Sequence, residues 1–502
     1  MKRFFLVFLL VGAISMLQAQ KLQKTALEIS DLKKATFTAS DGTLHCFGSD
    51  ENNYYVYYDI RTMSQTATDV KYVAMGKSKD SYFVINKKLS TVKRFFVLEN
   101  MHDRFLTITL NGNNVLILVA REQKSEQTTQ IIKQTYAKAT GKLLKETVIA
   151  TFPKSKTERW MFYSAVSPDE TKTGILLMIA TKKSMVDSYF AAVLDEAYNV
   201  EWRLENELDL SNESFSVNDV ALTNESELYV AFMSYPKTTA KKSYIDLVYL
   251  TENAKEKMDI PLEKHHFAKV QMKPLKNGDV YLTGLLSPNN KSLENAFFSM
   301  KINGKNFNDE GIHIKDISVK GYSLDIESIL ELDNGNIAVV CEQGFITAIR
   351  SQNITSYRQT RGSVTTFFVN GNDASIEDVS TMNKIQKTAS LYNVDAKIVG
   401  GSIFPFVYGN KVAYLFNDNF KKHTNPAKYS EKKGFEQDAK GKTACIVLST
   451  QESGEKAKLN VLTGKQEAAG RFFRQILFEE DGKLIVLTRN NKTAYIETLT
   501  LP

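Results

Sequence analysis

The sequence predicts an all-β protein built from repeated hairpins. Stretches of alternating apolar and polar residues run into a short turn, and a dense run of apolar, largely β-branched residues follows each turn, which is typical of a buried strand. No long amphipathic helix pattern lies between these hairpins. The seven turns lie at Asn111-Gly112-Asn113, Lys172-Thr173-Gly174, Asn224-Glu225-Ser226, Asn277-Gly278-Asp279, Asn334-Gly335-Asn336, Tyr408-Gly409-Asn410 and Asp481-Gly482-Lys483.

The spacing of these turns predicts a β-propeller. Successive turns are 52 to 74 residues apart, and the shorter intervals fit a unit of four antiparallel strands. A lone four-stranded sheet cannot bury both of its faces, so repeated sheets must stack, and stacking in a circle gives a propeller. The clearest units have expected strands at 215–222, 228–233, 244–250 and 257–260, and then at 267–274, 280–286, 296–302 and 311–314.

The two ends of the chain decide the number of blades. The last unit, residues 471–501, supplies only three strands, so we expect a strand from residues 22–47 to complete it and close the ring. Runs at 54–60, 71–76, 82–86 and 93–98 then leave room for one more blade. Strand counting therefore predicts seven or eight four-stranded blades, and a pair of β-sandwich domains is the alternative all-β architecture.

The N-terminus has the pattern of a secretory signal. Lys2 and Arg3 form a basic head, residues 4–16 are apolar, and Leu17-Gln18-Ala19 is a cleavage site ahead of Gln20. The apolar run is shorter than the about 20 residues that span a bilayer. We therefore predict a cleaved signal peptide over residues 1–19 and a single propeller domain over residues 20–502, with an uncleaved anchor as the alternative.

Charge and apolar patterning narrow the possible partners. The formal net charge is +7, and removal of Lys2 and Arg3 lowers it by two. This excess of basic over acidic residues is small and spread along the chain, so it does not indicate nucleic-acid binding. Every later apolar run is interrupted by Lys, Asp, Asn or Ser, so we expect no transmembrane span after signal cleavage.

The cysteines predict a fold held by its core. Cys46, Cys341 and Cys445 are far apart and odd in number, so at least one is left outside any disulfide within the chain. Cys341 and Cys445 lie in apolar strand runs, where cysteine usually acts as a small core hydrophobe.

Three segments depart from the repeat. Residues 343–362 separate two strands of the fifth unit and residues 417–442 do so in the sixth, and connections this long are usually functional or disordered. In residues 375–389, Ile376, Val379, Met382 and Ile385 recur every three residues, which favours a helix. A polar outer-edge strand is the alternative for that segment.

The usual sequence marks of catalysis and cofactor binding are absent. Gly441-Lys442-Thr443 ends like a phosphate-binding loop, but a strand follows it where the motif requires a helix. His265 and His266 are adjacent, so on a strand they point to opposite faces and cannot share a metal ion. No Gly-x-Ser-x-Gly elbow occurs. We therefore expect no cofactor and no metal.

The strongest candidate for a binding site is the segment 421–442, called here the lysine-rich segment. It holds seven lysines against three acidic residues, and its interleaved Tyr429 and Phe435 offer contact area to a partner that the lysines steer. A solvated insertion without a partner is the alternative. The residues that we expect to bind are Lys421, Lys422, Tyr429, Lys432, Lys433 and Phe435.

One unit carries a resemblance to a known family. Ser167-Pro168-Asp169-Glu170, followed by the run 175–180, resembles the Ser-Pro-Asp-Gly hairpin of TolB-type propellers, with Glu170 where those repeats have Gly. As a whole the chain resembles exported β-propeller proteins of Gram-negative bacteria. The resemblance implies an exported protein of the periplasm or the extracellular space, and we expect a monomer.

These observations support one functional hypothesis and leave a second open. The first is an exported, non-enzymatic propeller that binds a protein or glycan of the cell envelope through loops on one face, because a rigid repeat scaffold carries long irregular loops. The alternative is a hydrolase or lyase acting on a polysaccharide or peptide. Its acidic residues would come from different blades and meet at the central channel, which would leave no local motif.

Overall fold

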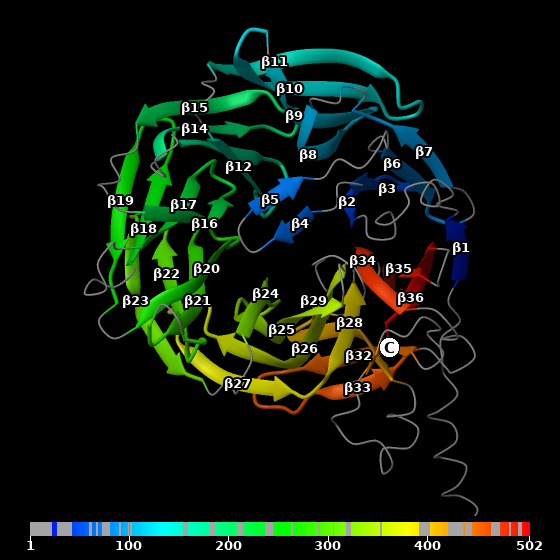
Figure 1. Ribbon diagram of the computed structural model, residues 1–502, viewed down its shortest axis with the longest axis vertical. Coiled ribbons are helices and arrows are strands. Elements are labelled where there is room, and N and C mark those ends of the chain that lie inside the picture. Colours follow the sequence, from blue (N-terminus) through cyan, green and yellow to red (C-terminus); the bar gives the residue numbers. More distant parts are fainter. Residues whose placement is uncertain are drawn as a thin grey trace, which may run out of the picture. The chain divides into compact units, whose positions relative to one another are not determined.

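The computed structural model describes twenty-four stretches of the chain. They are residues 23–27, 43–59, 63–66, 69–72, 81–89, 92–98, 100, 103–123, 125–153, 159–180, 186–207, 214–235, 244–262, 265–289, 292–304, 306–317, 323–351, 354–390, 402–419, 435–436, 444–462, 472–480, 483–489 and 494–501. Within these stretches all regular structure is β-strand and no helix occurs. The predicted fold class is confirmed: the protein is an all-β propeller of four-stranded antiparallel blades (Figure 1).

The chain divides into two compact units. Unit 1 comprises Met1–Arg94, Glu342–Thr365 and Ser380–Pro502, and unit 2 comprises Phe95–Cys341 and Thr366–Val379.

Unit 2 holds four regular sheets in chain order, followed by the start of a larger one. Each regular sheet is an antiparallel series in which consecutive strands are neighbours. The strands are β8 (Asp103–Asn111), β9 (Asn114–Gln123), β10 (Thr128–Ala137), β11 (Leu143–Pro153), β12 (Arg159–Val166), β13 (Thr173–Ala180), β14 (Val186–Leu194), β15 (Val200–Glu207), β16 (Ser214–Leu222), β17 (Leu228–Tyr235), β18 (Tyr244–Leu250), β19 (Lys255–Ile260), β20 (His266–Pro274), β21 (Val280–Ser287), β22 (Ala296–Asn303), β23 (Asn308–Asp316), β24 (Ser323–Glu331) and β27 (Ile376–Met382), of which β27 ends in unit 1.

Unit 1 holds both ends of the chain. Strand β25 (Ile337–Ser351) runs from unit 2 into it, β26 (Ile354–Val369) runs back into unit 2, and β7 (Val92–Phe96) crosses the other boundary. The remaining strands are β1 (Gln23–Leu27), β2 (Thr43–Ser49), β3 (Asn53–Asp59), β4 (Met63–Thr66), β5 (Asp69–Tyr72), β6 (Ser81–Asn86), β28 (Gln386–Ser390), β29 (Phe404–Tyr408), β30 (Lys411–Asn419), β31 (Phe435–Glu436), β32 (Ala444–Gln451), β33 (Lys458–Val461), β34 (Phe472–Glu480), β35 (Lys483–Arg489) and β36 (Ala494–Thr500).

The described strands form seven blades of four antiparallel strands, one larger sheet, and a separate two-stranded sheet of β4 and β5. The larger sheet has six strands in the order β24-β25-β26-β28-β31, with β27 also paired to β26. Its first four strands in the chain repeat the pattern of a blade, and β28 and β31 are additions. Of the predicted seven or eight blades, seven are therefore regular and one further sheet is enlarged.

The predicted closing strand is confirmed. β1 lies within the expected range 22–47 and pairs antiparallel with β36, from Gln23 opposite Thr498 to Leu27 opposite Ala494. The last sheet has the order β1-β36-β35-β34, so it joins the first and last strands of the chain. A three-stranded remainder at the C-terminus was sufficient to predict this pairing.

Three sequence predictions need correction. The N-terminal blade is β2-β3-β6-β7, so the run at 71–76 is not one of its strands and β2 takes that place. Residues 375–389 form β27 and part of β28, so the helix candidate is wrong and the strand alternative holds, with Ile376 and Val379 packed against the core cluster between β20–β23 and β24–β27. The turn predicted at residues 172–174 lies at 167–172, since Thr173 already begins β13.

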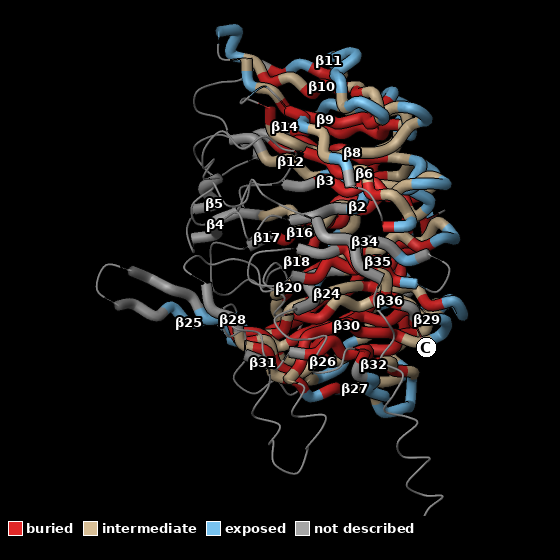
Figure 2. Tube along the Cα trace, turned by 90° about the vertical axis from the view of Figure 1, so that its right-hand side faces the viewer, coloured by how far each residue is buried: buried red, intermediate tan, exposed pale blue. Residues whose placement is uncertain are grey.

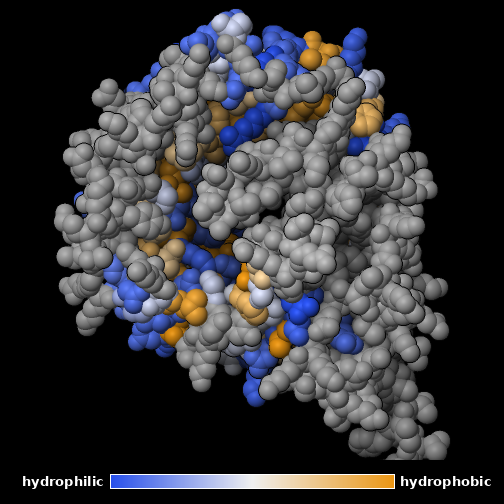
Figure 3. Space-filling model, in the orientation of Figure 1, coloured by the Kyte–Doolittle hydropathy of each residue, from blue (hydrophilic) through white to orange (hydrophobic). Residues whose placement is uncertain are grey.

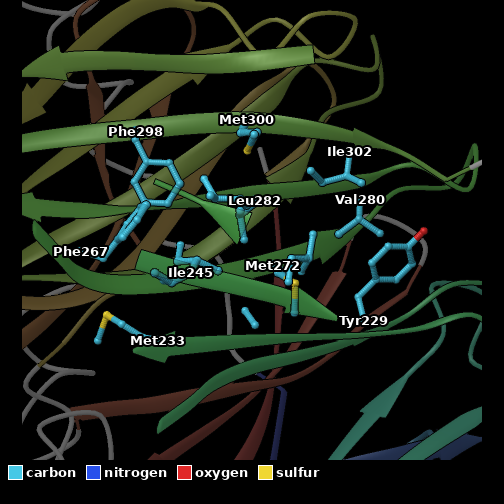
Figure 4. Close-up of a cluster of buried hydrophobic side chains, with 14 of the residues drawn as sticks. Tyr229, Met233, Ile245, Phe267, Met272, Val280, Leu282, Phe298, Met300 and Ile302 are labelled. Carbon is cyan, nitrogen blue, oxygen red and sulfur yellow. The ribbon is translucent and has the colours of Figure 1, made fainter. Parts of the chain in front are cut away.

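The core of unit 2 fills the space between each pair of successive sheets. One cluster joins β16–β19 to β20–β23, and it includes Tyr229, Met272, Leu282, Phe298 and Ile302 (Figure 4). Other clusters join β8–β11 to β12–β15, β12–β15 to β16–β19, and β20–β23 to the β24–β27 part of the larger sheet. Each fully buried phenylalanine or leucine stabilises the fold by about 1.5–3 kcal/mol, so the sheets of this unit depend on their neighbours for stability.

The second strands of the blades are buried as the sequence predicts. Along β21 every residue is buried, and β9 and β30 are exposed to solvent only near their ends. Both faces of these strands pack against neighbouring side chains, which explains their continuous apolar runs.

Four consecutive blades share one turn between their first two strands. In each turn the backbone amide of one residue donates a hydrogen bond to the carbonyl oxygen of the residue three positions earlier, over 2.9 to 3.3 Å. The donor residue has left-handed backbone angles. A type I turn followed by a left-handed residue is a common hairpin connection. The residues at this position are Glu170 (φ 60°), Ser226 (φ 68°), Gly278 (φ 89°) and Gly335 (φ 81°).

The cysteines lie as predicted. Cys341 and Cys445 are fully buried, Cys46 is exposed, and none of them forms a disulfide. The predicted signal peptide, residues 1–19, lies outside the described residues. Among the described residues, no helix is long and apolar enough to cross a bilayer.

Candidate functional site

The predicted binding residues fall mostly outside the structure. Lys421, Lys422, Tyr429, Lys432 and Lys433 lie outside the described residues. Phe435 is the first residue of the short strand β31, which pairs in parallel with β28, so that Phe435 lies opposite Gln386 and Glu436 opposite Lys387. The lysine-rich segment is therefore joined through its backbone to the enlarged sheet, while the binding role of these residues stays a prediction.

The enlarged sheet contains one long hairpin, formed by β25 and β26. β25 has 15 residues and β26 has 16, while β24 before them has nine and β27 after them has seven. The excursion predicted at 343–362 is therefore not an irregular loop, because most of it continues the two strands. We call residues 343–362 the extended hairpin, and they belong to unit 1.

The extended hairpin exposes apolar side chains. Phe345 is 41% exposed and Ile346 is 53% exposed, and the neighbouring Thr347 and Ala348 are also exposed (Figure 2). Adjacent residues of a strand point to opposite faces, so Phe345 and Ile346 present apolar surface on both faces of β25. A partner lying along this strand would find apolar contacts on either side.

A buried ion pair lies at the base of the extended hairpin. Glu342 of β25 and Lys384, which precedes β28, form a salt bridge with side chains that are 0% and 1% exposed. Ser402 Oγ donates a hydrogen bond to Glu342 Oε2 over 2.5 Å. Arg361 Nε of β26 lies 3.8 Å from the same oxygen. Two cations and a hydroxyl therefore compensate one buried carboxylate, as buried charge requires.

The same cluster extends toward the start of the lysine-rich segment. Lys384 Nζ also donates to Gln386 Oε1 over 2.5 Å. Gln386 Nε2 in turn donates to the backbone oxygen of Asn417, near the end of β30, over 3.0 Å. These bonds link the hairpin base, β28 and the strand from which the lysine-rich segment departs.

Two glycines make room for long side chains at the hairpin base. A Cβ added at Gly344 would lie 2.9 Å from Arg361 Nη1, and one added at Gly362 would lie 3.0 Å from Gln343 Oε1. Gly344 and Gly362 therefore allow Arg361 and Gln343 to cross to the opposite strand, where Arg361 comes near Glu342.

The extended hairpin is basic. Residues 343–362 include Arg350, Arg358 and Arg361 and no Asp or Glu. The lysine-rich segment adds seven lysines against three acidic residues. Opposite charge on a partner would therefore speed its association with this part of unit 1.

Exposed apolar residues also occur away from the hairpin. Leu143 and Leu144 on β11 are a second adjacent pair, 41% and 56% exposed. On the face seen in Figure 3, hydrophilic and hydrophobic residues are interspersed among the coloured atoms.

The buried carboxylates of the described residues have partners within the fold. Arg121 Nε donates to Asp103 over 2.6 Å, and Lys257 lies 3.1 Å from Asp246. The others are Glu294 with Lys269 at 3.4 Å, Glu342 with Lys384, Glu497 with Thr488 Oγ1 at 2.7 Å, and Asp418 with the amide of Asn419 at 2.8 Å. In the part of the chain that the structure describes, no group of His, Cys, Asp or Glu is arranged to hold a metal ion.

Sequence reasoning missed the exposed pair Phe345–Ile346 and the Glu342–Lys384 ion pair. The strand-like composition of 345–349 was a local signal for the first, although it lay inside a segment interpreted as a loop. The ion pair joins residues 42 positions apart and leaves no local signal.

Comparison with known proteins gives no family. No family model matches the chain, and no curated protein matches it. The resemblance to TolB-type repeats therefore stays a prediction.

Solved structures similar to this chain include propellers of several kinds. The polysaccharide lyase Uly1 has 9% identity and a TM-score of 0.39, covering 90% of this chain and 100% of its own. The β-propeller domain of the Trilobed protease from Pyrococcus furiosus has 11% identity and a TM-score of 0.35, covering 84% and 98%. Prolyl oligopeptidase B from Galerina marginata has 8% identity and a TM-score of 0.38, covering 92% and 57%. At such values we draw no argument about function from these similarities.

Proposed function

We propose that this protein is an exported, non-enzymatic β-propeller that binds a protein or glycan of the cell envelope. The binding site comprises the extended hairpin and the lysine-rich segment. Export is supported by the signal pattern of residues 1–19, in which the basic pair Lys2 and Arg3 precedes an apolar run.

The observation that carries this proposal is the extended hairpin itself. It exposes Phe345 and Ile346 on strands that are longer than the neighbouring β24 and β27. The buried Glu342–Lys384 pair holds the base of the hairpin within the sheet, and a base held in place lowers the entropic cost of binding. A binding role accounts for adjacent apolar residues that are exposed to solvent.

Capture of envelope material by matched variants tests the proposal. The chain starting at residue 20 is immobilised and incubated with protein and polysaccharide fractions of the envelope at low ionic strength. The site variants are Phe345→Asn/Ile346→Asn and Lys432→Glu/Lys433→Glu. The control is Leu143→Asn/Leu144→Asn on β11, which changes two apolar residues of nearly the same exposure.

The expected result is one set of species retained by the wild type and the β11 control and lost from both site variants. Retention of the same species by all four proteins would refute the site. Turnover of a polysaccharide or peptide by the purified wild type would instead favour the hydrolase or lyase alternative.

A further inference from the structure

We propose that the extended hairpin takes an acidic, extended segment of a partner protein, which adds a strand to the outer edge of β25. This inference rests on the proposed function and names the class of its partner. Its three supports are an available strand edge, the lack of the usual edge protection, and a one-sided charge.

The outer part of β25 presents a strand edge. β24 and β25 leave the same tight turn at residues 332–336, but β24 has nine residues and β25 has fifteen. Residues 346–351 of β25 therefore continue past the end of β24. Among the described strands only β24 and β26 are neighbours of β25, so these residues pair with β26 on one side and have no described strand on the other.

This edge lacks the features with which proteins usually protect edge strands. Charged residues and prolines on an edge normally prevent pairing with other chains. Among the terminal strands of the four regular sheets of unit 2, β15, β19 and β23 each carry four charged residues, whereas β11 carries two among its eleven residues. Residues 346–351 carry one, Arg350, and no proline. The composition of this edge thus favours strand addition.

The side chains beside the edge suit an added strand. Phe345 and Ile346 are exposed and point to opposite faces of β25. A strand laid along 346–351 would gain backbone hydrogen bonds from the edge and apolar cross-strand contacts on both faces.

The charge of this region selects an acidic partner. The extended hairpin holds three arginines and no acidic residue, and β31 joins the lysine-rich segment to the same sheet. Arg361 already lies near Glu342, whereas Arg358 is exposed. Two copies of this hairpin would bring like charges together, so electrostatics disfavours self-pairing and favours a segment rich in Asp or Glu.

A selection with displayed peptides tests the inference. Short random peptides are selected on the wild-type chain after depletion on the Phe345→Asn/Ile346→Asn variant. We expect enrichment of peptides that combine Asp or Glu with β-branched residues. A synthetic copy of an enriched peptide should slow amide hydrogen exchange at 346–351, and its affinity should fall as salt is added.

Three further measurements separate strand addition from simple charge attraction. The Phe345→Asn/Ile346→Asn variant should bind the synthetic peptide about tenfold more weakly, because apolar cross-strand pairs are lost. The Leu143→Asn/Leu144→Asn control should bind it as the wild type does. In an added strand, every second backbone N–H of the peptide points toward β25 and the others point away. Methylation of the nitrogens that face β25 should therefore abolish binding, and methylation of the other set should not.

The inference is overturned if the selection enriches no peptide, or enriches only basic or uncharged peptides. It is also overturned if amide hydrogen exchange slows only outside β25, or if neither of the two methylated peptides loses affinity. A dimer in sedimentation that depends on Phe345 and Ile346 would replace the acidic partner by a second copy. If envelope species are captured in a way that depends on the hairpin but no peptide is selected, the proposed function stands and this inference alone is refuted. If neither capture nor peptide selection depends on the hairpin, both are refuted.

Discussion

At the scale of single residues, the clearest structural signal is the left-handed position in the shared turn. Gly278 and Gly335 occupy it in two blades, but Glu170 and Ser226 occupy it in the two preceding ones. A side chain with a Cβ costs about 1–2 kcal/mol in left-handed backbone angles. Glu170 and Ser226 therefore carry backbone strain at a position where glycine would not.

Replacing Glu170 by glycine should stabilise the protein. Glycine relieves the backbone strain, but it also gives the unfolded chain more conformational entropy, which opposes folding. The net gain in the free energy of unfolding is about 0.5–1 kcal/mol. Thermal unfolding measures it as a raised midpoint. Glu170→Ala is the control, because it removes the carboxylate and keeps the Cβ, and an equal gain in this control would show that backbone strain is not the cause.

A second residue-scale feature is a carboxyl pair in unit 2. Asp246 of β18 lies opposite Asp259 of β19, and Lys257 Nζ lies 3.1 Å from the first and 3.0 Å from the second. Burial, followed by the hydrogen bond to Asp259, raises the pKa of Asp246 to about 6. The hydrogen bond from Asp246 holds the pKa of Asp259 below its usual range. The pair thus retains one proton in the folded state that the unfolded chain releases at lower pH.

This pair should make stability depend on pH. The folded-state pKa of Asp246 lies above its unfolded value, so the folded protein binds about one more proton between about pH 4 and pH 6. Stability from this group is then present at the acidic end of that window and is lost as the pH rises through about 6. Denaturation of the wild type and of Asp246→Asn across this window measures it. The difference in unfolding free energy between the two proteins should change with pH, and a constant difference would contradict the assignment.

At the scale of the elements, the extended hairpin is held by one buried ion pair. Removing one partner of a buried pair leaves the other charge without compensation, which is far more costly than losing an exposed pair. The chain offers both kinds for comparison. Glu342 and Lys384 are almost fully buried, while Lys458 and Glu455 are 67% and 49% exposed and lie 3.1 Å apart.

Lys384→Met should therefore destabilise the protein by about 3–5 kcal/mol, and Lys458→Met by less than about 1 kcal/mol. The double variant Glu342→Gln/Lys384→Met should be less destabilised than the sum of its single variants, because neither charge is then left uncompensated. Chemical denaturation measures all of these changes. If Lys384→Met and Lys458→Met destabilised the protein by similar amounts, the contribution of the Glu342–Lys384 pair to stability would not come from its burial.

At the scale of the whole chain, the first and last strands meet in a single sheet. β1 pairs along all five of its residues with β36. Without β1, β36 would become an edge strand that pairs only with β35, while β35 would keep both of its neighbours, β34 and β36. The blade is complete only when both ends of the chain contribute to it.

Deleting residues 20–27 should lower the thermal midpoint by several degrees, because one of four strands in this sheet is lost. The matched control lacks only residues 20–22, which precede β1, and should unfold as the chain starting at residue 20 does. Limited proteolysis should also cut the longer deletion faster near 494–500. Equal midpoints for the two deletions would show that β1 does not stabilise the last sheet.

Much of the fold could be predicted because its determinants are local. Turn residues such as Gly278 and Gly335, and apolar runs such as the one at 280–286, mark hairpins by residues that are adjacent in sequence. The candidate site could be predicted only in part. The lysine-rich segment was identified by its charge, but the extended hairpin was interpreted as a loop, and the segment 375–389 was left open between a helix and a polar outer-edge strand.

The sequence by itself determined the all-β class, the four-stranded repeat and the need for an N-terminal strand in the last blade, because turn chemistry and a period of two act between neighbouring residues. Only the tertiary structure decided that residues 343–362 extend two strands, and that Glu342 meets Lys384, Arg361 and Ser402. Strand length and ion pairing of this kind depend on residues brought together from distant parts of the chain. Their energies come from burial and pairing in space, which adjacent residues do not encode.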